Sequence, residues 1–84
     1  MGYHINEIPR GEYGFASKIN EEYLEWEDAI EQKNPIMELV ELSDLLGAIE
    51  AYTHKKYNLL LFDLWEMTKA TKRAFEDGTR QPRV

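Results

Sequence analysis

Two pairs of acidic residues, each spaced three apart, most constrain what this chain can fold into. Glu22 and Glu25 form the first pair, and Glu41 and Asp44 form the second. Each pair lies in a segment whose apolar residues recur with helical spacing, and residues three apart share one side of a helix. If the two helices pack with these sides facing, four carboxylates meet at one point. Because like charges repel, this arrangement predicts one or more hard divalent cations, which take oxygen ligands.

The chain is short and acidic. Its 84 residues suffice for one small domain spanning 1–84, and a core of this size is commonly completed by oligomerisation. The formal net charge of -6 argues against binding to nucleic acid or to an anionic membrane, since both need a basic patch. The absence of cysteine excludes disulfides, thiolate zinc sites and cysteine nucleophiles. With neither a signal peptide nor a membrane-spanning apolar run, we expect a cytoplasmic protein without a membrane partner.

The first part of the chain is predicted to be an irregular arm followed by a helix. Proline and glycine interrupt residues 1–16, so we expect no regular structure there. The arm could cover the core or a partner subunit, or it could close over a ligand with Arg10 pointing inward. The helix is predicted from about Ser17, which would cap its first turn, to about Lys33. Its predicted buried stripe contains four residues at helical spacing: Ile19, Tyr23, Trp26 and Ile30.

The acidic residues of this first helix divide into two groups. At about 100° per residue, Glu22 and Glu25 fall on one flank of the buried stripe, together with Lys18. Three other acids of this helix point away from that flank and are expected to face solvent: Glu21, Glu27 and Asp28. The helical geometry therefore separates candidate ligands from solvated side chains.

A second helix is predicted from about Pro35 to the mid-fifties. Asn34 suits its N-cap and Pro35 its first position, so the link between the helices is very short and predicts an antiparallel helical hairpin. The helix is apolar on most of its circumference, as is typical of a buried central helix. Its first apolar stripe contains Leu39, Leu42, Leu46 and Ile49. Glu41 and Asp44 lie within the other stripe, where an unpaired carboxylate is costly, and this placement is the strongest argument for a cation.

A third helix is predicted from about Leu59 to Glu76. Its buried stripe is expected to contain Leu61, Leu64, Trp65, Thr68, Thr71 and Phe75. On another side, Lys69 and Arg73 could hold phosphate oxygens, or they could pair with Glu66 at the surface. His54, at the preceding junction, could bind a metal or could be an exposed turn residue.

A basic tail is predicted at residues 77–84, after a helix stop at Gly78. The whole chain is thus predicted to be all-α, with three helices that assemble into an oligomeric helical bundle.

The acidic pairs and their surroundings resemble a known family. The pattern Glu-x-x-Glu, followed after a gap by Glu-x-x-Asp, is typical of the all-α nucleoside triphosphate pyrophosphohydrolases, the MazG-like family. Here fifteen residues separate the two pairs, and residues 21–30 look like the family's first-helix block. Residues 41–46 are similar to its Glu-Leu-Gly-Asp-Leu-Leu block, with Ser43 in place of the glycine. The resemblance covers residues 17–52 closely and the third helix more loosely.

The resemblance implies a fold, a reaction and a set of site residues. The fold would assemble as a homodimer or tetramer, and the enzyme would cleave a nucleoside triphosphate, often a deoxynucleotide, to the monophosphate and pyrophosphate. Four acids would hold Mg²⁺, for which Mn²⁺ could substitute: Glu22, Glu25, Glu41 and Asp44. Three basic residues would bind the substrate phosphates: Lys18, Lys69 and Arg73. Either Glu25 or Glu41 would act as the catalytic base that takes a proton from the attacking water.

Two interpretations without catalysis stay open from the sequence. In the first, the protein is a helical interaction module whose acids pair with Lys and Arg of a partner subunit. In the second, it is a nucleotide sensor that binds without turnover. Three aromatic side chains could stack on a base or could simply pack in the core: Tyr23, Trp26 and Tyr52.

Overall fold

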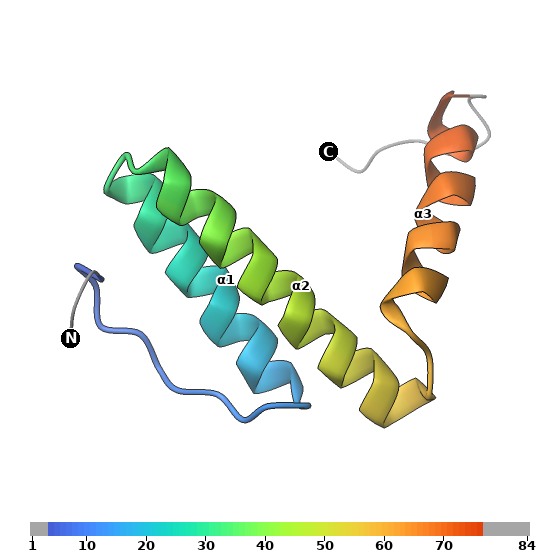
Figure 1. The fold of residues 1–84 in the computed structure, drawn as a ribbon, viewed down its shortest axis with the longest axis horizontal. Helices are drawn as coiled ribbons and strands as arrows, with labels where there is room; N and C mark the ends of the chain where they lie inside the picture. The colour runs from blue at the N-terminus through green and yellow to red at the C-terminus, as the bar shows by residue number, and fades with distance from the viewer. Residues whose placement is uncertain (1–3, 77–84) are drawn as a thin grey trace.

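The computed structural model describes residues 4–76, and this part of the chain contains three α-helices and no strand. The helices are α1 (Ala16–Glu31), α2 (Pro35–Tyr57) and α3 (Leu61–Glu76) (Figure 1). The predicted all-α class is therefore confirmed. The predicted tail at 77–84, with its helix stop Gly78, and the side chain of Phe75 lie outside what the structure describes.

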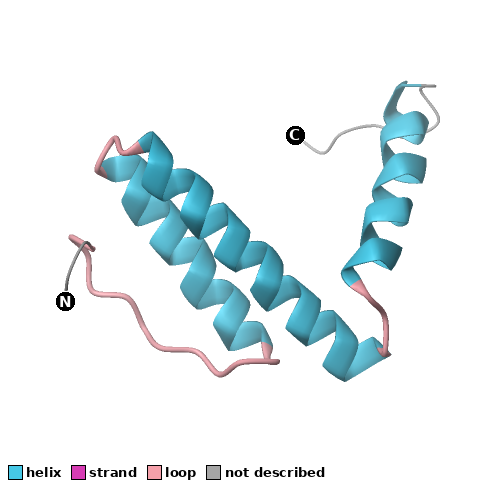
Figure 2. Ribbon diagram, viewed as in Figure 1, coloured by secondary structure: helices cyan, strands magenta, loops and turns pink. Residues whose placement is uncertain are grey.

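Among the helices of residues 4–76, α1 and α2 form a closely packed pair, and α3 contacts α2 alone. α1 and α2 lie side by side along their lengths and are connected by residues 32–34, whereas α3 leaves the far end of α2 and stands apart from α1 (Figure 1). Residues 4–15 form a loop that runs back along α1 (Figure 2). None of the helices in residues 4–76 combines the length and the apolar character needed to cross a membrane.

The ends of the helices follow local chemistry. α2 begins as predicted, because Asn34 Oδ1 accepts a hydrogen bond from the Met37 N–H at 3.1 Å and Pro35 occupies the first helical position. The predicted cap of α1 is wrong: the helix begins at Ala16, and no side chain caps it. Ser17 Oγ instead accepts the Glu12 N–H at 3.0 Å, which ties the arm to the helix.

The apolar core of one chain is smaller than the periodicity predicts. Among the described residues, the buried apolar side chains are Ala29, Met37 and Ala48. Tyr23 and Ile30, which were expected inside, are exposed. Their spacing does mark an apolar face, but α2 covers only part of the circumference of α1.

Parts of the predicted buried stripes of α2 and α3 are exposed as well. Leu39 is 68% exposed and Trp65 is 62% exposed, although both belong to predicted buried stripes, and Leu42 and Leu46 are exposed as well. The physical reason is that α3 stands apart, so neither α1 nor α3 covers the outer face of α2. The exposed side chains of these stripes therefore stay uncovered within residues 4–76.

Candidate functional site

The structure brings the four predicted acids together between α1 and α2. Carboxylate oxygens of Glu22, Glu41 and Asp44 lie within 4.8 Å of one another. Glu25 belongs to the same cluster, because its carboxylate lies within 4.8 Å of Glu41 in one group and of Glu22 in another. α1 supplies the first pair of acids and α2 the second, as their helical spacing predicts. We call these four residues the acid cluster.

The acid cluster is partly buried. Glu41 is 1% exposed and Glu22 is 6% exposed, whereas Glu25 is half-buried and Asp44 is exposed. Within residues 4–76, Glu22 Oε1 and Glu41 Oε1 are buried without a hydrogen-bond partner. A buried carboxylate oxygen without a partner is costly, and a cation coordinated between the helices would satisfy both atoms. The donor set consists of carboxylate oxygens, which fits a hard ion such as Mg²⁺.

The environment of the acid cluster disfavours ionisation of all its members at once. Burial, together with the negative charges of Glu22 and Glu41, raises the pKa of Glu25 to about 8. Burial also raises the pKa of Glu41, although its contact with Glu25 opposes this shift. Without metal, this environment favours a proton bound within the cluster, and a divalent cation would compete with that proton.

Lys18 lies at the edge of the acid cluster, as predicted from its position one turn before Glu22. Its Nζ is 3.1 Å from Glu22 Oε2 and 3.1 Å from Glu21 Oε1. The hydrogen bond to Glu22 is the main reason why the pKa of Lys18 is raised.

The prediction that Glu21 faces solvent is wrong. Its side chain is buried and accepts a hydrogen bond from the Gly11 N–H at 2.9 Å. The arm passes so close to α1 here that a Cβ on Gly11 would overlap the carbonyl of Ser17. Burial opposes ionisation of Glu21, but the hydrogen bonds from Gly11 and Lys18 prevail and lower its pKa.

Lys69 and Arg73 are not brought to the acid cluster within one chain. Both lie on α3 and are exposed, and Lys69 Nζ is 3.0 Å from Glu66 Oε2, the surface pairing that the sequence left open. Among the helices of residues 4–76, α3 contacts α2 but not α1, the helix that carries Glu22 and Glu25.

The arm carries a residue that the sequence analysis did not identify as part of the site. His4 Nε2 lies 3.8 Å from Glu25 Oε2, and His4, Glu25 and Glu41 each offer a ligand atom within 4.8 Å of the others. No motif points to His4, because its position depends on the path of an irregular segment.

Asp28 fixes the start of the arm on α1. It was expected to face solvent, but it is 1% exposed. The backbone N–H groups of Ile5 and Asn6 donate to Asp28 Oδ1 at 3.1 and 2.8 Å. The side chain of Asn6 also donates to Oδ1 at 2.8 Å, and that of Gln32 donates to Oδ2 at 2.7 Å. Burial alone would raise the pKa of Asp28, but these hydrogen bonds lower it to about 2. One signal was present in the sequence: Asp28 follows Glu25 by three residues, the spacing of neighbours on a helix.

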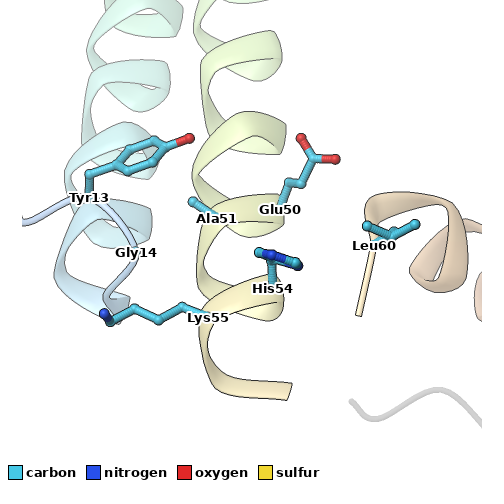
Figure 3. Close-up of a pocket in the computed structure, with 7 residues that line it drawn as sticks. All are labelled: Tyr13, Gly14, Glu50, Ala51, His54, Lys55 and Leu60. Carbon is cyan, nitrogen blue, oxygen red and sulfur yellow. The ribbon is translucent and has the colours of Figure 1, made fainter. Parts of the chain in front are cut away.

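A separate pocket of about 490 Å³ lies between the arm and the second half of α2 (Figure 3). It is lined by Tyr13, Gly14, Glu50, Ala51, His54, Lys55 and Leu60. None of these is one of the four predicted Mg²⁺ ligands or the three predicted phosphate-binding residues. His54, left open as a metal ligand, is exposed and belongs to none of the candidate metal-binding groups in residues 4–76. The pocket is therefore distinct from the acid cluster.

Comparison of the chain with models of protein families, with curated proteins and with solved structures gave no significant match. The candidate site therefore rests on its own geometry and on the pattern of its acids.

Proposed function

We propose that this protein is a Mg²⁺-dependent nucleoside triphosphate pyrophosphohydrolase, which cleaves between the α and β phosphates to give the monophosphate and pyrophosphate. The observation that carries the proposal is that Glu22 and Glu41, from two different helices, are buried and that each keeps a carboxylate oxygen without a partner in residues 4–76. The MazG-like pattern of the four acids supports the same reaction.

The residues that would hold the ion are the four acids of the cluster. Mg²⁺, or Mn²⁺ in its place, would supply neutralisation of the phosphate charge and acidification of an attacking water. Asp44 is the exposed member and would lie on the side from which a nucleotide enters. Lys18 would contribute a positive charge toward the phosphates at the edge of the site.

Of the two candidate bases, we favour Glu25. It is half-buried and so accessible to a water molecule, whereas Glu41 is fully enclosed between the helices. In this role Mg²⁺ would first displace the proton that Glu25 holds in the metal-free cluster, and the resulting Glu25 carboxylate would accept the proton of the attacking water while Glu41 stays a ligand.

The proposal includes assembly into a homodimer or tetramer, in which the antiparallel hairpin of α1 and α2 is completed by a second copy. Two observations support this step. Ile36, Leu39 and Val40 are exposed along α2, and an entirely apolar pocket of about 510 Å³ lies between α2 and α3. In such an assembly, Lys69 and Arg73 of one copy could reach the acid cluster of another, which would explain their distance from it within one chain.

The direct test is a pyrophosphate-release assay across the common NTPs and dNTPs, with the products separated by chromatography. We expect monophosphate and pyrophosphate in the presence of Mg²⁺, and neither when EDTA is added. Diphosphate and orthophosphate would contradict the proposed bond cleavage. Nucleotide binding in calorimetry without turnover would favour a nucleotide sensor, and the absence of binding would favour an interaction module.

Assembly can be tested with Leu39→Lys. A charge at this exposed apolar position should prevent burial of the α2 face, so we expect the mass measured by light scattering to fall from that of an oligomer to that of one chain. Ile5→Lys is the matched control, because Ile5 is also exposed but lies on the arm. A wild-type protein that is already monomeric, or a variant that stays oligomeric, would contradict this interface.

Competition between Mg²⁺ and the proton on Glu25 predicts a pH dependence. Because the folded-state pKa of Glu25 is raised from 4.5 to about 8, the folded chain holds a proton in this interval that the unfolded chain has released. Without metal, the contribution of Glu25 to the free energy of unfolding therefore decreases as the pH rises through the interval. Mg²⁺ replaces the proton, so the increase in Tm that it produces should grow over the same interval.

The measurement is thermal unfolding followed by circular dichroism at several pH values, with and without MgCl₂. NaCl at matched ionic strength is the control, because it screens charges without coordinating them. If NaCl stabilised the fold as strongly as MgCl₂, the acid cluster would be a screened charge patch and not a cation site.

A further inference from the structure

The arm places an imidazole against one end of the acid cluster. His4 Nε2 lies 3.8 Å from Glu25 Oε2, and one atom each of His4, Glu25 and Glu41 lie within 4.8 Å of one another. Ligand atoms held tetrahedrally around a single ion at about 2.1 Å lie about 3.4 Å apart, so these three atoms would need to approach one another by at most about 1.4 Å.

Asp28 holds the imidazole in a defined orientation. His4 Nδ1 is 3.3 Å from Asp28 Oδ2, and Asp28 is itself fixed by the N–H groups of Ile5 and Asn6. A histidine that binds a metal through one ring nitrogen characteristically donates the N–H of its other nitrogen to a carboxylate. Asp28 is the carboxylate in that position, and it leaves His4 Nε2 directed toward Glu25.

Glu41 supplies an independent indication of a ligand. It is 1% exposed, its Oε1 has no hydrogen-bond partner within the described chain, and it belongs to two groups of candidate ligands. One group is Glu22, Glu41 and Asp44, which offers oxygen atoms only. The other is His4, Glu25 and Glu41, which adds a nitrogen. A carboxylate shared by both groups is placed to serve two cations.

We propose that His4, Glu25 and Glu41 form a second cation subsite, which binds a borderline divalent transition-metal ion such as Zn²⁺ in preference to Mg²⁺. The preference follows from the imidazole, because nitrogen ligands suit Zn²⁺ and its neighbours whereas Mg²⁺ selects oxygen. The subsite rests on the proposed function in sharing two acids with the Mg²⁺ site. It also gives the arm a role, which is to carry a metal ligand to the helix pair.

Zn²⁺ titration of the full ¹⁵N-labelled chain, followed through the imidazole resonances in NMR spectra, tests the subsite. The sequence contains two histidines, so exposed His54 is an internal control. We expect the first equivalent of Zn²⁺ to shift the Nε2 resonance of His4 and to leave His54 unchanged. An unshifted His4, or equal shifts at both residues, would overturn the proposal and leave only the polar contacts of His4 with the acids.

Variants separate ligation from folding. His4→Gln should lose the high-affinity Zn²⁺ site seen in calorimetry, while its circular dichroism spectrum shows that the helices persist. Asp28→Asn should weaken Zn²⁺ binding by roughly 10–100-fold, because it removes the carboxylate that orients His4 and also loosens the arm, so the separation from folding rests on His4→Gln. His54→Gln is the control, with unchanged Zn²⁺ affinity and unchanged nucleotide hydrolysis. Full Zn²⁺ affinity in His4→Gln would overturn the subsite.

The two proposals can fail separately. A shift of His4 by Zn²⁺ in a protein that hydrolyses no nucleotide would support the subsite and contradict the proposed reaction. Hydrolysis with Mg²⁺ in a protein whose His4 does not respond to Zn²⁺ would overturn the subsite and leave the proposed reaction standing.

Discussion

Glu41→Gln is expected to remove nucleotide hydrolysis while leaving the fold intact. Glu41 is enclosed between α1 and α2 and belongs to both groups of candidate ligands that join the two helices. A neutral amide there supplies neither the negative charge nor the full coordination that a divalent cation needs. We expect kcat/KM for the best nucleotide to fall on the order of 10²–10³-fold, the range for loss of one preorganised electrostatic contact.

The same substitution should act on stability in the opposite direction. Burial raises the pKa of Glu41, and the negative charge of Asp44 adds to that effect. An amide of the same shape removes this unfavourable charge, so without Mg²⁺ the variant should unfold at the same temperature as the wild type or at a higher one. The increase in Tm produced by Mg²⁺ should shrink, because a ligand is missing.

Glu50→Gln is the matched control for this experiment. Glu50 lies on the same helix, is exposed and belongs to none of the candidate metal-binding groups in the described chain. It should keep both hydrolysis and the response to Mg²⁺. If Glu41→Gln hydrolysed nucleotides at the wild-type rate in a folded preparation, the acid cluster would not be the active site.

The part of the site that the sequence predicts is the part that local geometry determines. The i, i+3 spacing places each acidic pair on one side of its helix, and the Asn34–Pro35 start makes the link between the helices short. The spacing of the acids and the short link are together sufficient to pack α1 against α2 with the four carboxylates close to one another.

The part that the sequence does not predict depends on contacts between distant segments. Asp28 and Glu21 were expected to be solvated because nothing in the helical pattern shows that an irregular arm returns over them. The arm takes this path because its backbone N–H groups find buried carboxylates, a match that only the folded chain reveals. Periodicity likewise identifies apolar faces on α2 and α3 without showing that one chain leaves them uncovered.

Asp28→Asn is expected to produce the largest loss of stability that we predict. In an asparagine of the same shape, an NH₂ group replaces one of the two accepting oxygens. This donor would then face the N–H groups of the arm, which are donors as well. Burial raises the pKa of Asp28, but its hydrogen bonds outweigh burial and lower the pKa from 3.8 to about 2. At about 1.4 kcal/mol per pKa unit, this shift corresponds to roughly 2 kcal/mol of the free energy of unfolding.

The pH dependence distinguishes this carboxylate from a general packing defect. Because the folded-state pKa of Asp28 is lowered, its contribution is fully present above the unfolded-state value of 3.8 and is lost as the pH falls toward about 2. Urea unfolding followed by tryptophan fluorescence should therefore show a difference between wild type and variant that is constant near neutral pH and shrinks below pH 4. A difference that persisted unchanged in acid would mean that the amide disturbs packing and that the charge of Asp28 contributes nothing.

Glu31→Gln is the matched control for Asp28→Asn, because it changes an exposed carboxylate that binds the same segment. Glu31 Oε1 accepts from the Asn6 side chain at 2.9 Å. Since Glu31 is solvated, we expect its substitution to change the free energy of unfolding by no more than about 0.5 kcal/mol. Equal losses in the two variants would show that the arm is held by many weak contacts. A large loss in Asp28→Asn alone would show that one buried carboxylate anchors the arm, and with it His4, against the acid cluster.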